Sequence, residues 1–510
     1  MLANRLSEDP DKTVCLLEAG GGNRSPLLHI PAGWATNFNN PKVDWGYSTQ
    51  PEPELNDRQV YWPRGKVLGG SSAINGMVYI RGNARDFEDW SQLGAIGWGW
   101  EDVLPYFVKA ERQQTHHNEL HGNDGPLFVE DVRDPRSVDD VFINAMEASG
   151  IPKNADFNGA QQAGSGYYQF TQHAGRRWST ATAYLAPARS RKNLTVLTNA
   201  FVKKVQFSGK RATGVVLSRS DKEEVISANH IFLCGGSINS PQLLELSGIG
   251  QGERLQKLGI GVVHDAPEVG ENLQDHVLCK VVYGTQPEHS INREVQGLRL
   301  IPTALKWFFT RRGPLTSGSA PVGSFWYTRE GLDAPDIQIH YASGATLYNQ
   351  AGKIQPAKQA AMTAVVNQNR PLSRGSIHIG SNTPTDAPII HANYLSAPED
   401  RTCLIAGVRM LLNIFSQAQL EDYITDRIAP AVDRDIATDE GLLEYIREEA
   451  STTYHPTSTC AIGRVVDETL KVKGVEGLSI ADASVMPTVV SGNTNAATIM
   501  IAEKAAANWC

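Results

Sequence analysis

The 510-residue chain lacks several features that would assign it to whole classes of protein. It has no run of about 20 apolar residues, so no segment is expected to cross a bilayer as a helix. Its formal charge of −8 argues against nucleic-acid binding, which requires basic patches. Otherwise, 41% hydrophobic and 20% charged residues indicate an ordinary globular protein, and the length favours two domains.

Cysteine is also sparse. The six cysteines are scattered and form no C-x-x-C pair, so we expect no metal site and no disulfide framework, as in a reducing compartment. Cys15 and Cys234 lie in apolar strand-like runs and are expected in the core. No secretory signal opens the chain. These absences predict a cytoplasmic protein, and they leave a peripheral contact with the inner membrane open.

The sequence lacks the G-x-G-x-x-G loop of dinucleotide-binding folds as well. Residues 14–17 form a short apolar run followed by Glu18 and glycines, which is typical of a buried parallel strand whose terminal carboxylate holds ribose hydroxyls. An acidic residue there can equally be a helix cap. The glycine loop normally precedes the carboxylate by about 20 residues. We therefore expect either a strand and glycine loop upstream of Met1 or impaired cofactor binding by this chain.

A glycine-rich stretch, residues 62–82, carries a more specific signal. It reads W-P-R-G-K-V-L-G-G-S-S-A-I-N-G-M-V-Y-I-R-G. Gly65, Gly69 and Gly70 would let the backbone approach a flat ligand closely. Ser71 and Ser72 could cap a helix whose amides face that ligand. The alternative is a Gly-Ser turn before a buried helix.

A polar turn near the C-terminal end supplies a candidate base. His455 stands in S-T-T-Y-H-P-T-S-T-C, where Pro456 disfavours helix at the preceding residue. A helix over 439–450 must therefore end, and His455 should project from the turn. A second polar cluster, S-G-N-T-N-A-A-T at 491–498, opens the last helix. A lone histidine in a loop is more often structural, but the other motifs favour a functional role.

Together these motifs resemble the glucose–methanol–choline (GMC) flavin oxidoreductases. G-K-V-L-G-G-S-S-A-I-N resembles the first family signature, and G-S-I-N-S-P-Q-L-L-E-L-S-G-I-G (236–250) resembles the second. L-L-E-A-G-G, V-G-E-N-L-Q-D-H (269–276) and the H-P…N-T-N ending also match in order. The similarity spans the chain and is greatest to the choline dehydrogenase and aliphatic alcohol dehydrogenase branch. The chain departs from the family in the missing loop and at Ser458, where relatives often have glycine.

The resemblance implies an α/β plus α+β fold. An FAD-binding Rossmann-like domain lacking its first strand would comprise 1–112, 185–275 and 455–510, and an antiparallel-sheet substrate domain would comprise 113–184 and 276–454. The hydrophobic patterning agrees with this outline. It predicts strands over 14–17, 195–202, 213–218, 231–234, 322–327, 336–341, 361–366 and 374–379, and helices over 1–6, 241–247, 404–414 and 440–450.

Two other segments leave alternatives open. Residues 111–125 are polar, and His116, His117 and His121 could bind a metal, but a solvated loop is the favoured interpretation and no metal site is predicted. Residues 298–309 are apolar and include Trp307 and Phe308. They form either a buried helix or a membrane-surface patch, and we favour the buried helix.

The resemblance also implies the chemistry. FAD would accept hydride at N5 from a primary alcohol, choline-like or aliphatic, to give the aldehyde, and electrons would pass to a quinone or another carrier. His455 would be the base, since an ordinary pKa near ~6.5 suits proton acceptance. Asn493 would orient the alcohol oxygen, and His276 is expected to be structural. The implied cofactor-binding residues are Glu18, Gly20, Arg64, Gly65, Val67, Leu68, Gly69, Gly70, Ser71, Asn75, Gly76, Met77, Val78, Val202, Asp482, Ala483, Asn495 and Thr498.

Three other hypotheses remain open from the sequence. The protein could be an alcohol oxidase that uses oxygen, an FAD-containing hydroxynitrile lyase, or an N-terminally truncated and inactive chain. The motifs do not fix the alcohol, because choline would require a carboxylate or an aromatic cage for its cation.

Overall fold

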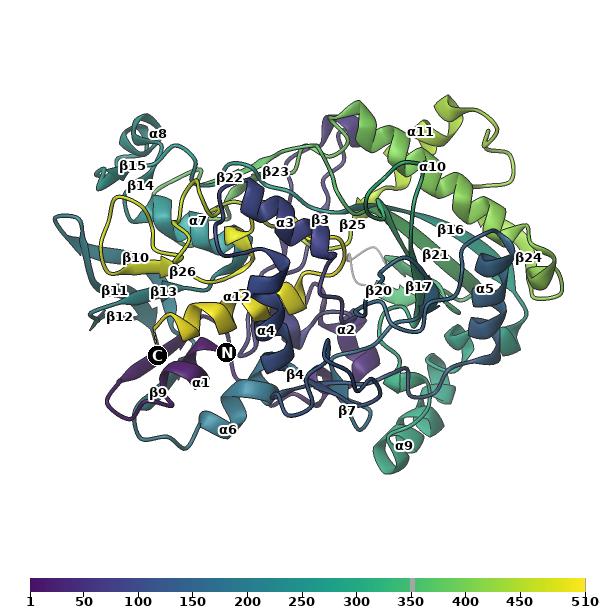
Figure 1. Ribbon diagram of the computed structural model, residues 1–510, viewed down its shortest axis with the longest axis horizontal. Helices are drawn as coiled ribbons and strands as arrows, with labels where there is room; N and C mark the ends of the chain where they lie inside the picture. Colours follow the sequence, from purple (N-terminus) through teal and green to yellow (C-terminus); the bar gives the residue numbers. More distant parts are fainter. Residues whose placement is uncertain (349–353, 510) are drawn as a thin grey trace.

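The computed structural model describes residues 1–348 and 354–509, and its largest element is an antiparallel sheet (Figure 1). The strand order is β24-β16-β21-β18-β17-β6, with β25 paired to β16 off this path. The strands are β6 (Gly164–Tyr167), β16 (Val277–Thr285), β17 (Val322–Trp326), β18 (Ile337–Ala342), β21 (Ala361–Gln368), β24 (Ile424–Ala429) and β25 (Ser451–Thr452). The strands predicted over 322–327, 336–341 and 361–366 are thereby confirmed.

One strand that was predicted for this sheet exists but belongs to another sheet. Residues 374–379 contribute β22 (Ser376–His378), which pairs with β23 (Ile389–His391) in a separate two-stranded sheet. The alternating pattern identifies a strand but not its partner, because pairing depends on which distant segment lies alongside.

Helices cover the large sheet. α10 (Pro398–Phe415) packs on β16 and β21, and α5 (Ser137–Ala148) and α11 (Asp439–Glu449) flank it (Figure 1). Leu404, Val408 and Leu411 of α10 recur at helical spacing and are fully buried, which explains why this face lies on the sheet. The helices predicted over 404–414 and 440–450 are confirmed.

The other half of the molecule contains two parallel strand pairs. β1 (Val14–Glu18) pairs with β9 (Leu194–Thr198), and β13 (Ile231–Leu233) pairs with β26 (Leu478–Ile480), each as a separate two-stranded sheet. The expectation that Cys15 and Cys234 are core residues is wrong, since both are exposed. They line the large cavity described below instead of packing against a neighbouring element.

Two boundaries in this half differ from the prediction. Residues 195–202 span the end of β9 and the start of β10 (Phe201–Ser208), and it is β10 that pairs with β11 (Arg211–Arg219), itself paired with β12 (Lys222–Ser227). Helix α7 (Gly236–Leu246) begins before Pro241, which lies inside it. The proline cannot donate to the carbonyl of Ser237, and that carbonyl accepts a hydrogen bond from Thr459 Oγ1 instead (2.7 Å).

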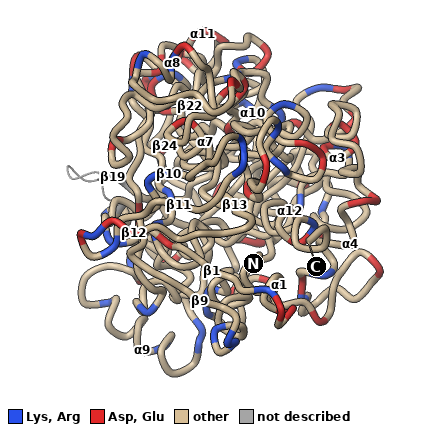
Figure 2. Tube along the Cα trace, turned by 90° about the vertical axis from the view of Figure 1, so that its left-hand side faces the viewer, with Lys and Arg blue, Asp and Glu red and all other residues tan. Residues whose placement is uncertain are grey.

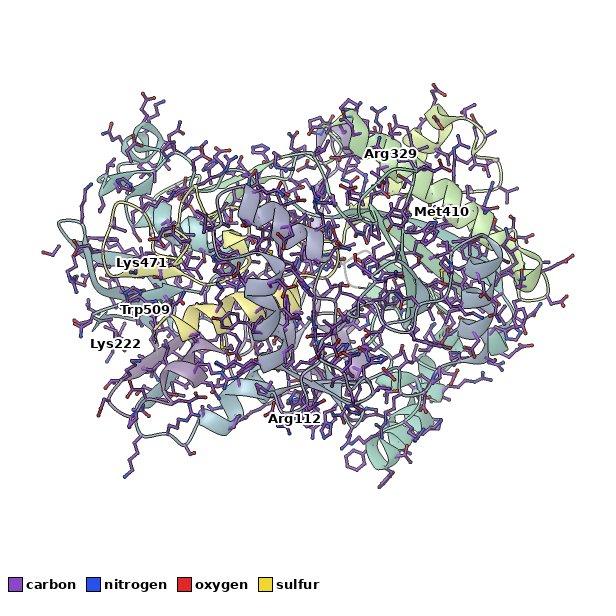
Figure 3. All side chains as sticks on the ribbon, viewed as in Figure 1. Arg112, Lys222, Arg329, Met410, Lys471 and Trp509 are labelled. Carbon is purple, nitrogen blue, oxygen red and sulfur yellow. The ribbon has the colours of Figure 1, made fainter. Side chains whose placement is uncertain are left out.

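Each half has its own hydrophobic core. On the parallel-strand side, α12 (Asn495–Ala507) packs against α1 (Leu2–Leu6) and α4 (Trp100–Ala110). Trp509, just beyond α12, packs against His230 with tilted rings whose centroids lie 3.9 Å apart, and Lys471 Nζ lies 6.0 Å from the centroid of the Trp509 ring. Figure 3 labels Lys471 and Trp509. The residue boundaries between the two halves remain a proposal, and Cys510 lies outside the described residues.

The structure distinguishes the alternatives that the sequence left open for residues 111–125 and 298–309. His121 is buried, so the solvated-loop expectation is wrong at this residue. Burial lowers its pKa, but hydrogen bonds to Asp156 (2.9 Å) and Glu111 (3.1 Å) outweigh burial and raise the pKa to about 9. Within residues 1–348 and 354–509, no group of three or more His, Cys, Asp or Glu residues is placed to hold a metal ion.

The buried-helix expectation for 298–309 is also wrong. The helix itself is confirmed as α9 (Leu300–Thr310), but Trp307 is its one buried residue. No helix in the described part of the chain is long and apolar enough to span a membrane.

Candidate functional site

A cavity of about 2010 Å³ is lined both by the parallel strands and by the large sheet. This volume exceeds the ~300–1,000 Å³ of a site for a drug-sized ligand, so it can hold a large cofactor together with a substrate. Every predicted site residue lines the cavity except Gly20, Val67 and Leu68. Val67 and Leu68 are buried in two separate hydrophobic clusters behind the wall, and Gly20 packs against the backbone of Lys66.

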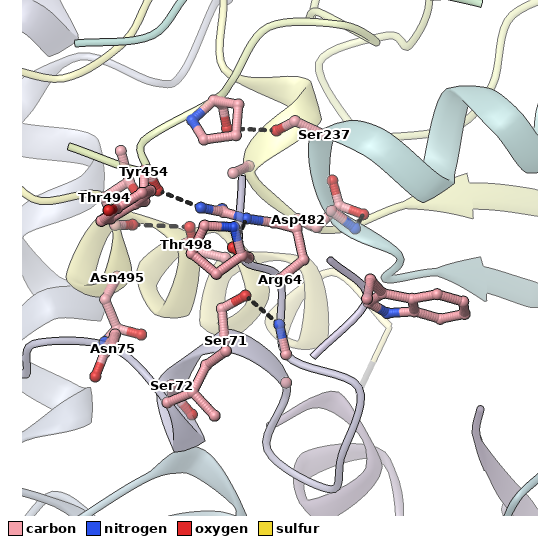
Figure 4. A pocket seen from close by; sticks show the side chains of 18 of the residues that line it. Arg64, Ser71, Ser72, Asn75, Ser237, Tyr454, Asp482, Thr494, Asn495 and Thr498 are labelled. Atoms are coloured by element: carbon pink, nitrogen blue, oxygen red, sulfur yellow. Dashed lines mark hydrogen bonds between the residues drawn. The ribbon is translucent and has the colours of Figure 1, made fainter. Parts of the chain in front are cut away.

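The glycine-rich stretch, residues 62–82, exposes part of its backbone to the cavity. Gly70 has φ +53°, and a Cβ there would meet nothing within 4 Å, so a side chain would project into the cavity. A Cβ on Gly65 would lie 2.2 Å from the carbonyl of Gly70. Ser71 Oγ accepts from the Gly65 N–H (3.1 Å; Figure 4). The predicted helix is only one 3-10 turn, η4 (Gly70–Ala73), which leaves the backbone open to a ligand.

Two carboxylates on the cavity wall differ in what they already bind. Glu18 ends β1 and accepts from the Gly20 N–H (2.7 Å), and burial raises its pKa. Asp482 uses both oxygens within the protein: Oδ2 accepts from the Gly236 N–H (2.8 Å) and Ser240 Oγ (2.6 Å), and Oδ1 accepts from Ser484. Glu18 is therefore the better placed of the two to hold hydroxyls of a ligand.

The backbone around His455 is clamped on both sides. β25 ends three residues before His455, and Tyr454 adopts φ +67°. Arg64 Nη2 donates to the Tyr454 carbonyl (2.7 Å; Figure 4), and the His455 N–H donates to Asp275 Oδ1 (2.7 Å). His455 is 8% exposed and lines the cavity. The V-G-E-N-L-Q-D-H motif thus supplies the residue that holds the histidine backbone.

A chain of hydrogen bonds determines which ring nitrogen of His455 carries hydrogen. His276 Nε2 lies 2.9 Å from the Asn369 carbonyl, which can only accept, so Nε2 of His276 carries hydrogen. Burial lowers the pKa of His276 to about 4, so the ring is neutral near pH 7 and its Nδ1 is an acceptor. That Nδ1 lies 3.0 Å from His455 Nδ1. His455 Nδ1 therefore donates, and its Nε2 keeps a lone pair.

Thr453 supports the same tautomer. Its Oγ1 donates to the His276 carbonyl (3.1 Å) and lies 2.9 Å from His455 Nδ1, where it can accept. Burial is the main cause that lowers the pKa of His455 well below its usual value; a charged His276 would lower it further, but His276 is neutral near pH 7. The site therefore presents a neutral imidazole whose unprotonated Nε2 is available as a base.

Asn493 and His455 meet across the cavity wall. Asn493 Nδ2 lies 3.2 Å from His455 Nε2, and Asn493 Oδ1 accepts from Gln338 Nε2 (3.1 Å). Gln338, on β18, thus fixes the amide with its donor toward the histidine. His340, on the same strand, also lines the cavity, and burial lowers its pKa to about 3.

Other predicted site residues lie around the His455–Asn493 pair. Asn75 Oδ1 accepts from Arg177 Nη1 (2.7 Å), and Thr498 Oγ1 donates to the Thr494 carbonyl (2.8 Å; Figure 4). Val202 lines the cavity from β10. Ser458, the departure noted in the sequence, has φ +77°, a left-handed conformation in which glycine is unstrained.

Sequence reasoning missed the contacts that three residues make with the pair: Thr453, Gln338, and His276, which was expected to be structural. Thr453 lies in the quoted histidine motif and His276 ends V-G-E-N-L-Q-D-H, so both belong to motifs that the sequence analysis had already identified. Gln338 lies in an ordinary buried strand, and no sequence motif marked it as a site residue. The large cavity, the exposed glycine backbone and the neutral histidine beside an amide define an enzyme site that holds a large cofactor next to a general base.

The chain belongs to the GMC oxidoreductases, because family models described as GMC oxidoreductase match residues 15–278 and 371–502. It is 40% identical over 518 residues to an alcohol dehydrogenase (acceptor) of Pseudomonas putida, covering 99% of this chain and 92% of the relative. It is 40% identical over 520 residues to the mitochondrial choline dehydrogenase of Mus musculus, covering 99% and 86%. Pyridoxine 4-oxidase from Mesorbium loti superposes with a TM-score of 0.87 at 27% identity, covering 100% and 96%.

GMC oxidoreductases are FAD-containing flavoproteins with an FAD-binding part and an antiparallel-sheet part. The residues present fit this cofactor. Gly70 leaves open space where a side chain would obstruct a flat ring system, and the Glu18 carboxyl lies at the end of a parallel strand.

Proposed function

We propose that this protein is an FAD-dependent alcohol dehydrogenase that oxidises a primary alcohol to the aldehyde and passes the electrons to a quinone or another carrier. The observation that carries the proposal is the His455 ring, buried in the cavity wall with Nε2 3.2 Å from the Asn493 amide and with acceptors at Nδ1 that leave Nε2 unprotonated. The name of the Pseudomonas putida relative, an alcohol dehydrogenase (acceptor), supports a carrier as electron acceptor. We place the enzyme in the cytoplasm, in peripheral contact with the inner membrane.

Each group of the site has a distinct part in this reaction. When bound, FAD supplies the hydride acceptor; Glu18, the 65–71 backbone, Val202, Asn495 and Thr498 would hold it. His455 Nε2 takes the hydroxyl proton of the alcohol. Asn493 Nδ2 then donates to the oxygen as negative charge develops there.

The proton taken up by His455 makes its ring an imidazolium. Nδ1–H of that ring faces two acceptors, His276 Nδ1 and Thr453 Oγ1. Hydrogen bonds to a charged donor are worth about 1.5–3 kcal/mol, so these acceptors stabilise the charge in a buried site. His276 is accordingly a positioning residue that sets the tautomer and supports the protonated ring.

The charges on the cavity wall favour an uncharged alcohol over choline. Among the described lining residues on the substrate side, Glu449 pairs with Lys280 (2.7 Å), and Glu448 pairs with Arg434. Leu278 and Val282 line the cavity beside Lys280. With Glu448 and Glu449 both paired and apolar side chains beside them, this part of the wall suits an aliphatic alcohol better than a quaternary ammonium ion.

The test is flavin reduction without oxygen. The purified protein should show a flavin absorbance band that bleaches when alcohol is added anaerobically. 3,3-Dimethylbutan-1-ol, the uncharged isostere of choline, should bleach it with a higher kcat/KM than choline does. A bound flavin that no alcohol bleaches would contradict a dehydrogenase and support the lyase, and rapid peroxide formation in air would support the oxidase.

A further inference from the structure

One surface of the molecule exposes far more apolar area than the rest. Six of the fourteen exposed large hydrophobic side chains of the described residues lie within residues 298–309, which we call the α9 patch. They are Leu298 (83% exposed), Leu300 (40%), Ile301 (57%), Leu305 (52%), Phe308 (61%) and Phe309 (76%). Scattered apolar side chains are ordinary on a protein surface, but a contiguous group marks an interaction site.

The helix is attached by one face and presents the other to solvent. Trp307 is buried and its Nε1 donates to the Gly175 carbonyl (2.9 Å), and Thr303 Oγ1 donates to the Glu294 carbonyl (3.0 Å). Ile301, Leu305 and Phe308 follow i, i+4, i+7 spacing and therefore share the outer face. In Figure 1, α9 lies at the edge of the molecule, away from the parallel strands.

The segment that contains the α9 patch is rich in basic residues, although the protein as a whole is acidic. Residues 293–312 contain five basic residues and one acidic residue, whereas the whole chain has a formal charge of −8. The acidic residue, Glu294, is paired with Arg136 (2.6 Å), and Arg312 is paired with Asp134 (3.0 Å), so four of the five cations remain for a partner. Arg311 stacks over Trp307 at 4.2 Å. Blue residues accompany this part of the trace in Figure 2.

We propose that the α9 patch docks the protein onto an anionic lipid bilayer. The helix would lie in the plane of the interface, with Ile301, Leu305 and Phe308 among the acyl chains and the flanking cations on the lipid phosphates. A basic amphipathic helix has the two attractions that such binding requires, apolar burial and charge. A second copy of this chain is the poorer partner, because a two-fold contact would bring the same cations together.

The docking surface adjoins the cavity wall. Asn292, shortly before α9, donates through Nδ2 to the carbonyls of Ala345 (2.8 Å) and Ala357 (2.7 Å), and both alanines line the cavity. Docking would therefore hold this part of the wall near the bilayer, into which apolar alcohols and quinones partition.

Vesicle cosedimentation of the purified holoprotein tests the proposal. The protein should bind phosphatidylcholine vesicles that contain phosphatidylglycerol, bind pure phosphatidylcholine vesicles weakly, and dissociate as salt is added. The double variant Phe308→Ser/Phe309→Ser should lower the partition coefficient roughly tenfold or more. Arg299→Gln and Lys306→Gln should each lower it by about fivefold on anionic vesicles.

The matched control is Leu93→Ser/Ile96→Ser, which removes two side chains that are 58% and 75% exposed elsewhere on the surface. It should bind vesicles like the unchanged protein. All variants should keep their activity toward a soluble artificial acceptor, since none of these residues contacts the cavity.

Two results would overturn the proposal. One is vesicle binding that responds neither to phosphatidylglycerol nor to the α9 variants. The other is a dimer in solution that the phenylalanine variant dissociates, with no vesicle binding by the unchanged protein. Sedimentation requires no turnover, so a protein that binds vesicles but oxidises no alcohol would contradict the proposed activity and leave the docking surface standing.

Discussion

The contact between His276 and His455 can be tested atom by atom. In His276→Asn, the side-chain oxygen can take the place of Nδ1 and accept from His455, but nothing reaches the Asn369 carbonyl. In His276→Gln, the amide nitrogen can take the place of Nε2 and donate to Asn369, but no acceptor faces His455. The two variants therefore separate the acceptor that His455 needs from the anchor that holds residue 276.

The size of the effect follows from the charge that His455 acquires. Losing a hydrogen bond from a charged donor costs about 1.5–3 kcal/mol, or roughly 10- to 150-fold in rate. Thr453 Oγ1 still accepts from His455 Nδ1 in both variants. We therefore expect His276→Gln to slow flavin reduction by about tenfold, the lower end of this range, and His276→Asn to stay within about fivefold of the unchanged protein.

The assay is anaerobic stopped-flow reduction of bound flavin by alcohol across a range of pH. The acceptor favours the protonated form of His455 and so raises its pKa above the value without it. Its loss in His276→Gln should move the acid limb of the kcat/KM profile to lower pH, which a purely structural defect would not do. Equal rates and superimposable pH profiles for the two variants would refute the tautomer argument.

The remaining predictions concern the base, its partner, the cofactor cradle and the buried histidines. His455→Ala should slow flavin reduction by about 10²-fold or more with flavin still bound, because the proton acceptor is gone. Asn493→Ala should raise the barrier to reduction by about 2–4 kcal/mol, the contribution of a donor to a developing oxyanion. Gly70→Ala should reduce the flavin bound per chain, measured by absorbance, because its methyl group enters the cavity from a left-handed backbone. Burial lowers the pKa of His276 to about 4 and that of His340 to about 3, whereas unfolded histidines titrate near ~6.5. As pH falls below ~6.5 the unfolded state takes up protons first, so the free energy of unfolding should fall by up to about 1.4 kcal/mol per pH unit for each ring, as checked by urea denaturation at two pH values.

Each of these expectations has a contrary result. Near-normal turnover by His455→Ala with flavin bound would remove it as the base. An Asn493→Ala protein that loses only thermal stability would make Asn493 a structural cap. Full flavin occupancy in Gly70→Ala would place the cofactor away from this loop. Stability that is flat between neutral and mildly acidic pH would mean that the two buried rings titrate normally.

The sequence by itself determined the local structure and the family. Apolar runs bounded by turns predicted β1, β13 and the central strands of the large sheet, because backbone preference and side-chain period act over a few residues. The long glycine and histidine motifs in a fixed order indicated a flavoprotein, and the chain belongs to that family. These signals are short-range or contiguous, so they can be recognised without a fold.

Only the tertiary structure decided which side chains are buried, which face solvent and which contact one another. Residues 298–309 have the same helical pattern whether that face meets a core or solvent, and the structure leaves it exposed. Cys15 and Cys234 lie in strand-like apolar runs, yet they face the cavity. His276 and His455 are 179 residues apart in the chain, and Gln338 on β18 reaches Asn493 in the loop before α12. Burial and hydrogen-bond partners depend on which distant segments pack together. The protonation of the His455 ring depends in turn on its burial and on those partners.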